Sequence, residues 1–166
     1  LLDITVIESG RLDLNVTPGS LSQLAQERMD MLQTTAKRKE IRLVGQYEII
    51  PEVSFDRARM AQVIDNLISN AIKFSPPGSA VEVRVGAHPG TAMFQVSDQG
   101  PGISDEDREK LFGAFQKLSA LPTGGEKSTG LGLSIVKKIV DAHQGEIRVE
   151  SALGEGAVFS VTLPMS

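Results

Sequence analysis

One helical stripe constrains the fold of this chain more than any other feature. After Asp56, apolar residues recur at helical spacing: Met60, Val63, Ile64, Leu67, Ile68 and Ala71. A stripe of this kind packs against a second apolar layer. Asp56 is a suitable N-cap, and the Ser-Pro-Pro-Gly run at 75–78 ends the helix. The sequence therefore predicts a long helix lying on a core whose other layer comes from the rest of the chain.

Alternating strand patterns supply that other layer. Two hairpins are predicted from strands that flank glycine-containing turns, and three shorter strands are predicted elsewhere. The hairpins pair 81–85 with 93–97 and 147–150 with 158–163, and the shorter strands lie at 12–16, 41–44 and 53–55. Strands and helices alternate without an internal repeat.

Three further helices are predicted between these strands. Ser20 and Gln23 form a capping-box start for the first, a short helix follows Ser104, and another runs from about Leu131 to His143. We therefore expect an α+β fold. It is a two-layer α/β sandwich, with a mixed, mostly antiparallel sheet and about three helices packed on one face.

Composition excludes several classes of function. The 166 residues carry 17 basic and 21 acidic side chains, a net charge of −4, without a basic tract, so we expect no nucleic acid partner. The absence of cysteine excludes disulfides and cysteine-based zinc sites, and two histidines make any zinc site improbable. No apolar run approaches the length of a membrane span, and we expect a cytoplasmic location, with attachment to a membrane through another part of the protein left open.

Asn66, Asn70 and Lys73 lie along the border of the apolar stripe. At 100° per residue they fall within roughly 60° of one another on the helix. Amide oxygens are hard, neutral ligands that suit Mg²⁺, and a lysine attracts phosphate. A solvated helix edge, with Lys73 placed favourably in the last turn, would show the same pattern.

Asp98 stands at the end of a predicted strand, and Gly100 and Gly102 follow it. A carboxylate there accepts hydrogen bonds, for example from the exocyclic amine of adenine. The glycines allow the backbone to approach a flat ligand closely. An ordinary strand-to-helix turn has the same composition.

A second glycine segment, 130–133, opens the last predicted helix. Backbone amides at a helix N-terminus bind phosphate well, and Ser128 and Thr129 precede them. The segment lacks the third glycine of a dinucleotide-binding fingerprint and the Gly-Lys pair of a Walker loop. A glycine-rich hinge remains the alternative. The stretch 118–129 before it has no periodicity and is the length of a functional loop.

In combination these segments resemble the ATP-binding domain of two-component sensor histidine kinases, whose Bergerat-type fold is shared with gyrase, mismatch-repair and heat-shock chaperone ATPases. Residues 66–74 resemble the asparagine box, and 98–102 the first glycine box. Phe112 and Phe115 resemble the phenylalanine box, and 129–133 the second glycine box. The similarity covers about residues 11–164, in matching order and spacing.

The resemblance implies a set of roles. Asp98 holds the adenine amine, Asn70 is the Mg²⁺ ligand with Asn66 in support, and Lys73 places phosphates; these last three are the candidate catalytic residues. Residues 104–129 correspond to the ATP lid. The implied nucleotide site comprises Asn66, Asn70, Lys73, Phe74, Asp98, Gly100, Gly102, Ile103, Phe115, Lys117, Ser128, Thr129, Gly130, Leu131, Gly132 and Leu133.

Two positions depart from relatives in an informative way. Hydrolysing relatives place a glutamate, the base that activates water, where this chain has Asn66. Transfer to a protein acceptor is therefore expected over rapid hydrolysis. Lys117 replaces an arginine frequent in the kinases, which keeps the charge and loses the bidentate fork.

Neither histidine lies in the acceptor context of these kinases, which is a histidine followed by an acidic residue on a long helix. Residues 1–10 resemble only the end of the dimerisation hairpin, and 11–166 the catalytic domain. The acceptor histidine is therefore expected outside this sequence. The resemblance implies a receiver domain of a response regulator as downstream partner and a homodimeric parent, with this fragment monomeric or weakly associated. A degenerate nucleotide-binding module and, less favoured, a hydrolysing ATPase are the alternatives.

Overall fold

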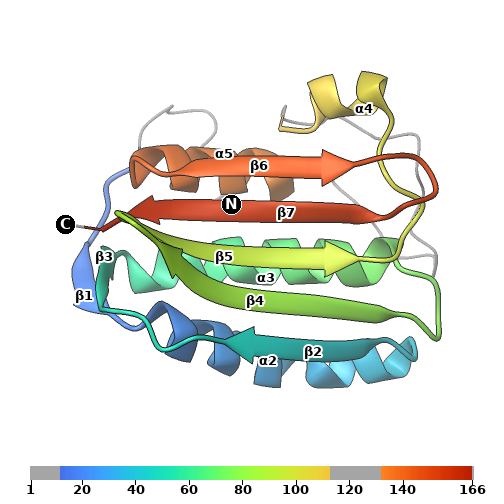
Figure 1. Ribbon diagram of the computed structural model, residues 1–166, viewed down its shortest axis with the longest axis horizontal. Helices are drawn as coiled ribbons and strands as arrows, with labels where there is room; N and C mark the ends of the chain where they lie inside the picture. Colours follow the sequence, from blue (N-terminus) through green and yellow to red (C-terminus); the bar gives the residue numbers. More distant parts are fainter. Residues whose placement is uncertain (1–11, 113–131, 166) are drawn as a thin grey trace.

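The computed structural model describes residues 12–112 and 132–165, which form two layers (Figure 1). The elements in chain order are β1 (Thr17–Gly19), α2 (Leu21–Arg38), β2 (Arg42–Tyr47), β3 (Val53–Phe55), α3 (Arg57–Phe74), β4 (Ala80–His88), β5 (Thr91–Asp98), α4 (Asp105–Lys110), α5 (Gly132–Ala142), β6 (Glu146–Ser151) and β7 (Ala157–Pro164). Both expected hairpins are present, as β4–β5 and β6–β7.

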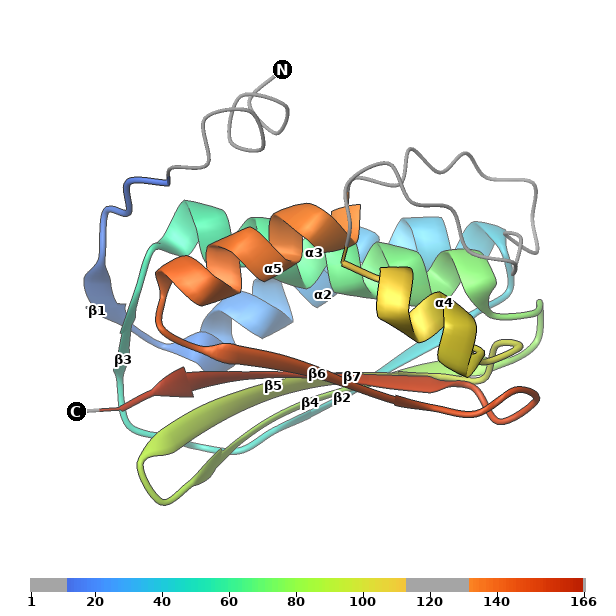
Figure 2. The same cartoon turned by 90° about the horizontal axis from the view of Figure 1, so that it is seen from above.

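One layer is a five-stranded sheet in the order β2-β4-β5-β7-β6, and β1 and β3 form a separate two-stranded ladder. In the larger sheet only β2 and β4 run parallel, and the other three pairs are antiparallel. Figure 2 shows α2, α3 and α5 side by side on one face of this sheet. The expected mixed, mostly antiparallel two-layer sandwich is confirmed.

The core lies between the helices and the inner face of the sheet. All six residues of the stripe on α3 are at most 3% exposed, as are the inward residues Val83 on β4 and Phe94 on β5. Alternate residues of β4, β5 and β7 are buried, as expected for a sheet with one covered face. Burial of the stripe thus fixes which side of α3 is left for other contacts.

Side-chain caps set the helix starts where the sequence predicted them. Ser20 Oγ accepts a hydrogen bond from Gln23 N, and Ser104 Oγ accepts one from Asp107 N, each at 3.1 Å. Asp56 caps α3 by accepting from Arg59 N at 3.1 Å. These bonds satisfy backbone donors that a helix cannot satisfy internally.

The prediction of a strand at 12–16 is wrong. That stretch is irregular, and the first strand is β1, which pairs with β3. The backbone N–H of Asn15 donates to Asp56 Oδ2 at 2.8 Å and is directed at the start of α3. Pro18 is tolerated in β1 because this short ladder has only two strands.

The two longest helices, α2 and α3, are also joined by a polar contact. Arg28 on α2 donates from Nε to Asp65 Oδ1 at 2.9 Å and from Nη2 to Asp65 Oδ2 at 2.7 Å. This two-bond geometry fixes orientation as well as attraction. It lies on the side of α3 that the apolar stripe leaves uncovered.

Candidate nucleotide-binding site

The end of α3 and the end of β5 meet at the right-hand side of Figure 1. A small cavity lies there, lined by Asn70, Phe74, Asp98, Pro101, Gly102, Ile103, Ala157 and Phe159. Its volume is about 20 Å³, close to the space of one water molecule. A nucleobase would therefore enter only with movement of the lining side chains.

The structure brings together five residues that the sequence assigned to the site: Asn70, Phe74, Asp98, Gly102 and Ile103. Pro101 and the two residues of β7 were missed. Ala157 is opposite Asp98 in the β5–β7 ladder, so β7 forms one wall. The available signal was the hairpin predicted from 147–150 and 158–163, which lies within the stretch that resembles the kinase domain.

Asp98 is the chemically most specific residue of the cavity. Its Oδ1 accepts hydrogen bonds from Gly100 N at 2.9 Å and from Ala157 N at 3.2 Å. Burial raises the pKa of this carboxyl, and the two backbone bonds oppose that rise without cancelling it. Within the described ranges Oδ2 accepts no hydrogen bond, so a directed acceptor is left for a ligand amine.

The glycine turn after Asp98 is packed without room for side chains. Gly102 has φ +79°, and a Cβ there would stand 2.0 Å from Ala152 O. A Cβ on Gly100 would stand 2.5 Å from Phe74 O. Both distances are far shorter than any real contact, so glycine is required at both positions.

The three polar residues of α3 divide between different neighbours. Asn70 lines the cavity, whereas Lys73 lines a groove of about 610 Å³ between α2 and α3. Asn66 faces the start of α5, since a Cβ on Gly132 would lie 3.6 Å from its Oδ1. Asn66 and Gly132, one residue from each of the two segments, are therefore adjacent in space.

Several sequence-assigned residues cannot be placed. Phe115, Lys117, Ser128, Thr129, Gly130 and Leu131 lie outside the described residues. Phe112 and Leu133 are partly buried and pack against the core. Phe112, which resembles part of the phenylalanine box, thus makes a core contact in the described structure.

The donors at this site suit a metal that keeps most of its ligands from phosphate and water. The described residues contain no group of three or more histidine, cysteine or acidic side chains able to hold a metal ion. The Asn70 amide, next to a cavity, matches the way Mg²⁺ is bound through few protein ligands plus phosphate oxygens. His88 is exposed at the end of β4, and His143 is engaged with the start of α3, so neither joins the site.

No helix within the described ranges is long and apolar enough to cross a membrane.

Residues 55–166 match the family described as "Histidine kinase-, DNA gyrase B-, and HSP90-like ATPase". The chain is 40% identical over 167 residues to the circadian input-output histidine kinase CikA of Synechococcus elongatus, covering 99% of this chain and 22% of CikA. It spans about a fifth of the length of the curated relatives it matches.

Solved structures agree with this match. Full-length ShkA in complex with AMPPNP superposes with a TM-score of 0.84 at 28% identity, covering 99% of this chain and 34% of ShkA. The catalytic domain of histidine kinase ThkA superposes with a TM-score of 0.78 at 28% identity, covering 92% of this chain and 97% of that domain. The similarity therefore extends over nearly the whole of an isolated kinase catalytic domain.

Proposed function

Because the chain belongs to the histidine kinase-, DNA gyrase B- and HSP90-like ATPase family, we propose that it is the catalytic domain of a sensor histidine kinase. In this proposal the chain binds Mg-ATP at the cavity between α3 and β5. The γ-phosphoryl group then passes to a histidine on a dimerisation hairpin outside this sequence. Residues 1–10 are the end of that hairpin, 11–166 the catalytic domain and 104–129 its ATP lid.

The observation that carries the proposal is the environment of Asp98. Its Oδ1 is fixed by two backbone N–H groups, and the residue lines the cavity. A carboxylate held in this way selects a ligand that presents a hydrogen-bond donor, such as the adenine amine. Phe74 and Ile103 supply the apolar surface for the faces of a base.

The residues of α3 serve the phosphate end. The Asn70 amide supplies an oxygen for Mg²⁺, Asn66 supports it, and Lys73 supplies positive charge for the phosphates. When bound, Mg²⁺ would neutralise phosphate charge. Gly132 and Leu133 open α5, and backbone amides at a helix N-terminus bind phosphate, which supports their assignment to the phosphate end.

Phosphoryl transfer needs positioning and charge neutralisation more than a strong base. In the proposed reaction an acceptor histidine nitrogen bonds to the γ-phosphorus, and the bond from that phosphorus to the bridging oxygen breaks. ADP leaves with the electron pair. Asn66 is an amide and cannot take a proton from water, which supports transfer over hydrolysis. The receiver domain of a response regulator would accept the phosphoryl group next.

Binding tests the pocket first. We expect the wild-type chain to bind the non-hydrolysable analogue AMPPNP in a Mg²⁺-dependent manner, and Asp98→Ala to abolish most of that binding. Asp30→Ala, which removes an exposed carboxylate on α2, is the matched control and should bind normally. Equal affinity in wild type and Asp98→Ala would contradict the pocket assignment.

Transfer is tested by adding a separately made hairpin that carries the acceptor histidine. Labelled γ-phosphate should appear on the hairpin in acid-labile form and not on this chain. Label on His88 or His143 would contradict the proposal of an external acceptor. Tight ATP binding without any transfer would favour a degenerate module, and rapid phosphate release without an acceptor would favour a hydrolase.

A further inference from the structure

Lys39 connects the end of α2 to the end of α3. It is the C-cap residue of α2, and its Nζ donates to Ile72 O at 2.8 Å and to Lys73 O at 2.7 Å. The last four carbonyls of an α-helix have no partner within the helix, and Ser75 N already donates to Ala71 O. The Lys39 ammonium thus satisfies the next two carbonyls of α3, with the sign of charge that a helix C-terminus favours.

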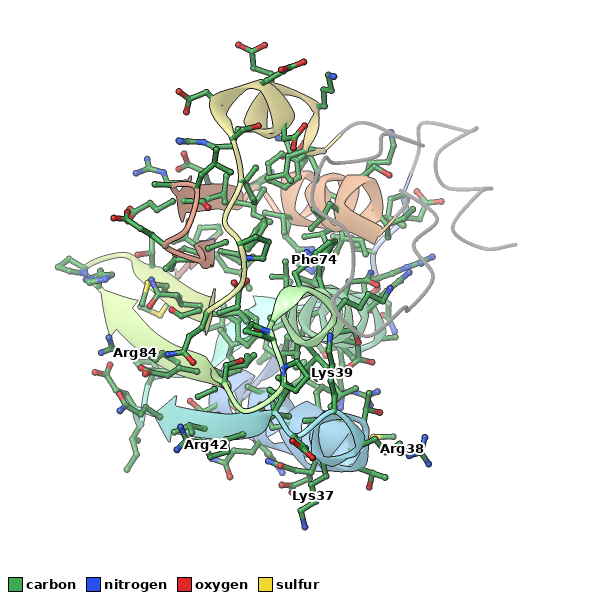
Figure 3. All side chains as sticks on the ribbon, turned by 90° about the vertical axis from the view of Figure 1, so that its right-hand side faces the viewer. Lys37, Arg38, Lys39, Arg42, Phe74 and Arg84 are labelled. Atoms are coloured by element: carbon green, nitrogen blue, oxygen red, sulfur yellow. The ribbon has the colours of Figure 1, made fainter. Side chains whose placement is uncertain are left out.

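The direction of this side chain distinguishes it from its neighbour. Figure 3 shows Lys39 between the ends of α2 and α3, below Phe74, whereas Lys37 projects from the other side of α2 into solvent. Lys37 is exposed, and Lys39 is partly buried. Two lysines of one helix end therefore have the same charge and different neighbours.

The opposite side of the same helix turn is also held. A Cβ on Gly100 would stand 2.5 Å from Phe74 O, so the turn after Asp98 packs directly on the last carbonyl of α3. The residues after α3 are tied to those after α2, since Gly78 N donates to Glu40 O at 2.9 Å and Arg42 N to Ser79 O at 3.0 Å. The last turn of α3 is therefore enclosed between the end of α2 and the glycine turn that follows Asp98.

We propose that Lys39 is a positioning residue for Mg-nucleotide binding: its two hydrogen bonds, to Ile72 O and Lys73 O, fix the last turn of α3 and thereby the placement of Lys73. The inference rests on the proposed function and extends it to a residue on another helix. Lys39 itself contacts backbone oxygens, and it acts on the nucleotide through the turn that it holds.

The groove around Lys39 indicates that its positioning role can be measured separately from its contribution to stability. The groove between the two helix ends is about 610 Å³ and is lined by Thr35, Ser69 and Lys73 among others. Water can enter such a groove and hydrate the two carbonyls if the ammonium is removed, so the net stability lost is modest. Water does not fix the orientation of the turn. We therefore expect the loss of nucleotide affinity to exceed the loss of stability.

The test compares three variants of this chain by calorimetric titration with Mg-AMPPNP. Lys39→Met keeps the stem and removes the donors, Lys39→Arg keeps donors and charge, and Lys37→Met removes the neighbouring charge without the contact. If the competent turn is populated only a tenth of the time without the ammonium, Lys39→Met weakens binding about tenfold. Lys39→Arg should restore most of the affinity, and Lys37→Met should bind like wild type.

Adenosine binding distinguishes a specific effect of Lys39 on the phosphate end from a general loss of structure, which would weaken both ligands. Adenosine lacks phosphates, and Phe74 on the base side is held separately by the packing of Gly100 against its carbonyl. Adenosine affinity, measured by NMR shifts, should therefore be unchanged in Lys39→Met while Mg-AMPPNP affinity falls. Wild-type affinity for Mg-AMPPNP in Lys39→Met, an equal loss in Lys37→Met, or a parallel loss of adenosine binding would each overturn the inference. If Lys39→Met does not fold, Lys39→Gln replaces it, with an intermediate loss expected and no loss counting against the proposal.

The wild-type titration distinguishes failure of the proposed function from failure of the proposed role of Lys39. Failure of the wild type to bind Mg-AMPPNP overturns the proposed function together with the role of Lys39. Normal wild-type binding with an unaffected Lys39→Met overturns only the role of Lys39.

Discussion

His143 accepts a hydrogen bond from the backbone N–H of Asp56, with 3.0 Å between Nε2 and the amide nitrogen. Its Nδ1 lies 2.8 Å from Ile139 O, a carbonyl that can only accept. The ring therefore donates from Nδ1 and accepts at Nε2, which is the neutral form. This contact joins the residue after α5 to the N-cap of α3, so the two helices that carry the glycine and asparagine segments are tied at this end.

Replacing His143 by phenylalanine should destabilise the protein by about 1–3 kcal/mol, because a largely buried N–H loses its acceptor. Urea unfolding followed by circular dichroism measures this change. His88→Ala is the control, since His88 is exposed at the end of β4, and it should stay within about 0.5 kcal/mol of wild type. Equal stability of His143→Phe and wild type would show that the contact contributes nothing net.

Gly102→Ala should be much more damaging than Gly154→Ala. The two glycines have similar dihedrals, φ +79° and +84°, but an added Cβ meets Ala152 O at 2.0 Å at Gly102 and nothing within 4 Å at Gly154. The shared cost of a left-handed alanine is about 1–2 kcal/mol. Thermal unfolding should show that cost alone for Gly154→Ala and a larger loss for Gly102→Ala. Similar losses would mean that the turn relaxes away from Ala152.

Nucleotide affinity should begin to fall in acid at a higher pH than an ordinary aspartate would cause. Burial raises the pKa of Asp98 above its usual 3.8. The ionised carboxylate is the form that accepts from an amine, so protonation as the pH falls through this raised pKa removes binding. Asp98→Asn does not titrate and is the reference that cancels protonation of the phosphates. A constant ratio of wild-type to Asp98→Asn affinity down to pH 4 would contradict the prediction.

The raised pKa of Asp98 has the opposite effect on folding stability: acid favours the folded state where it weakens nucleotide binding. A carboxyl whose folded pKa is raised is disfavoured in its charged form, so folding is favoured by its protonation and weakens as the pH rises from the unfolded to the folded pKa.

Asp56 has the opposite pH dependence of stability. Burial alone would raise its pKa, but backbone hydrogen bonds from Asn15 and Arg59 and the positive charge of the Arg59 side chain lower it overall. Its contribution is present above the ordinary pKa and is lost as the pH falls through the lowered value.

The pair of Arg28 and Asp65 should show a coupling of about 1 kcal/mol in a double-mutant cycle with alanine. Its side chains are 26% and 33% exposed and make two hydrogen bonds. Arg57 and Glu27 join the same two helices, with side chains 52% and 45% exposed, so water screens them more and their coupling should be smaller. Equal couplings would show that geometry and burial add nothing at this position.

The fold was largely predictable because it depends on local patterns. The stripe on α3 has the helical period, the hairpins alternate around glycine turns, and the caps at Ser20, Asp56 and Ser104 are short-range signals. The expected strand at 12–16 failed because alternation alone cannot show that Asn15 N is drawn to Asp56, 41 positions later.

The site was predictable only in part, because it also depends on contacts between residues far apart in the sequence. Asp98 and its glycines form a recognisable run, but the wall formed by Ala157 and Phe159 depends on pairing between β5 and β7. The bond of Lys39 to Ile72 likewise spans 33 positions. A sequence shows which residue types are present, whereas such contacts require knowledge of which elements become neighbours.

The position of β7 has a consequence for biosynthesis. Among the described residues it is the last strand in sequence, yet it lies inside the sheet between β5 and β6. Domains emerge from the ribosome N-terminal part first, so β5 has an open edge and Asp98 lacks the Ala157 N–H until the final hairpin has been made. A polypeptide that ended before Ala157 would contain the residues of every helix described here, but it would lack the β7 wall of the cavity and the second N–H that holds Asp98 Oδ1.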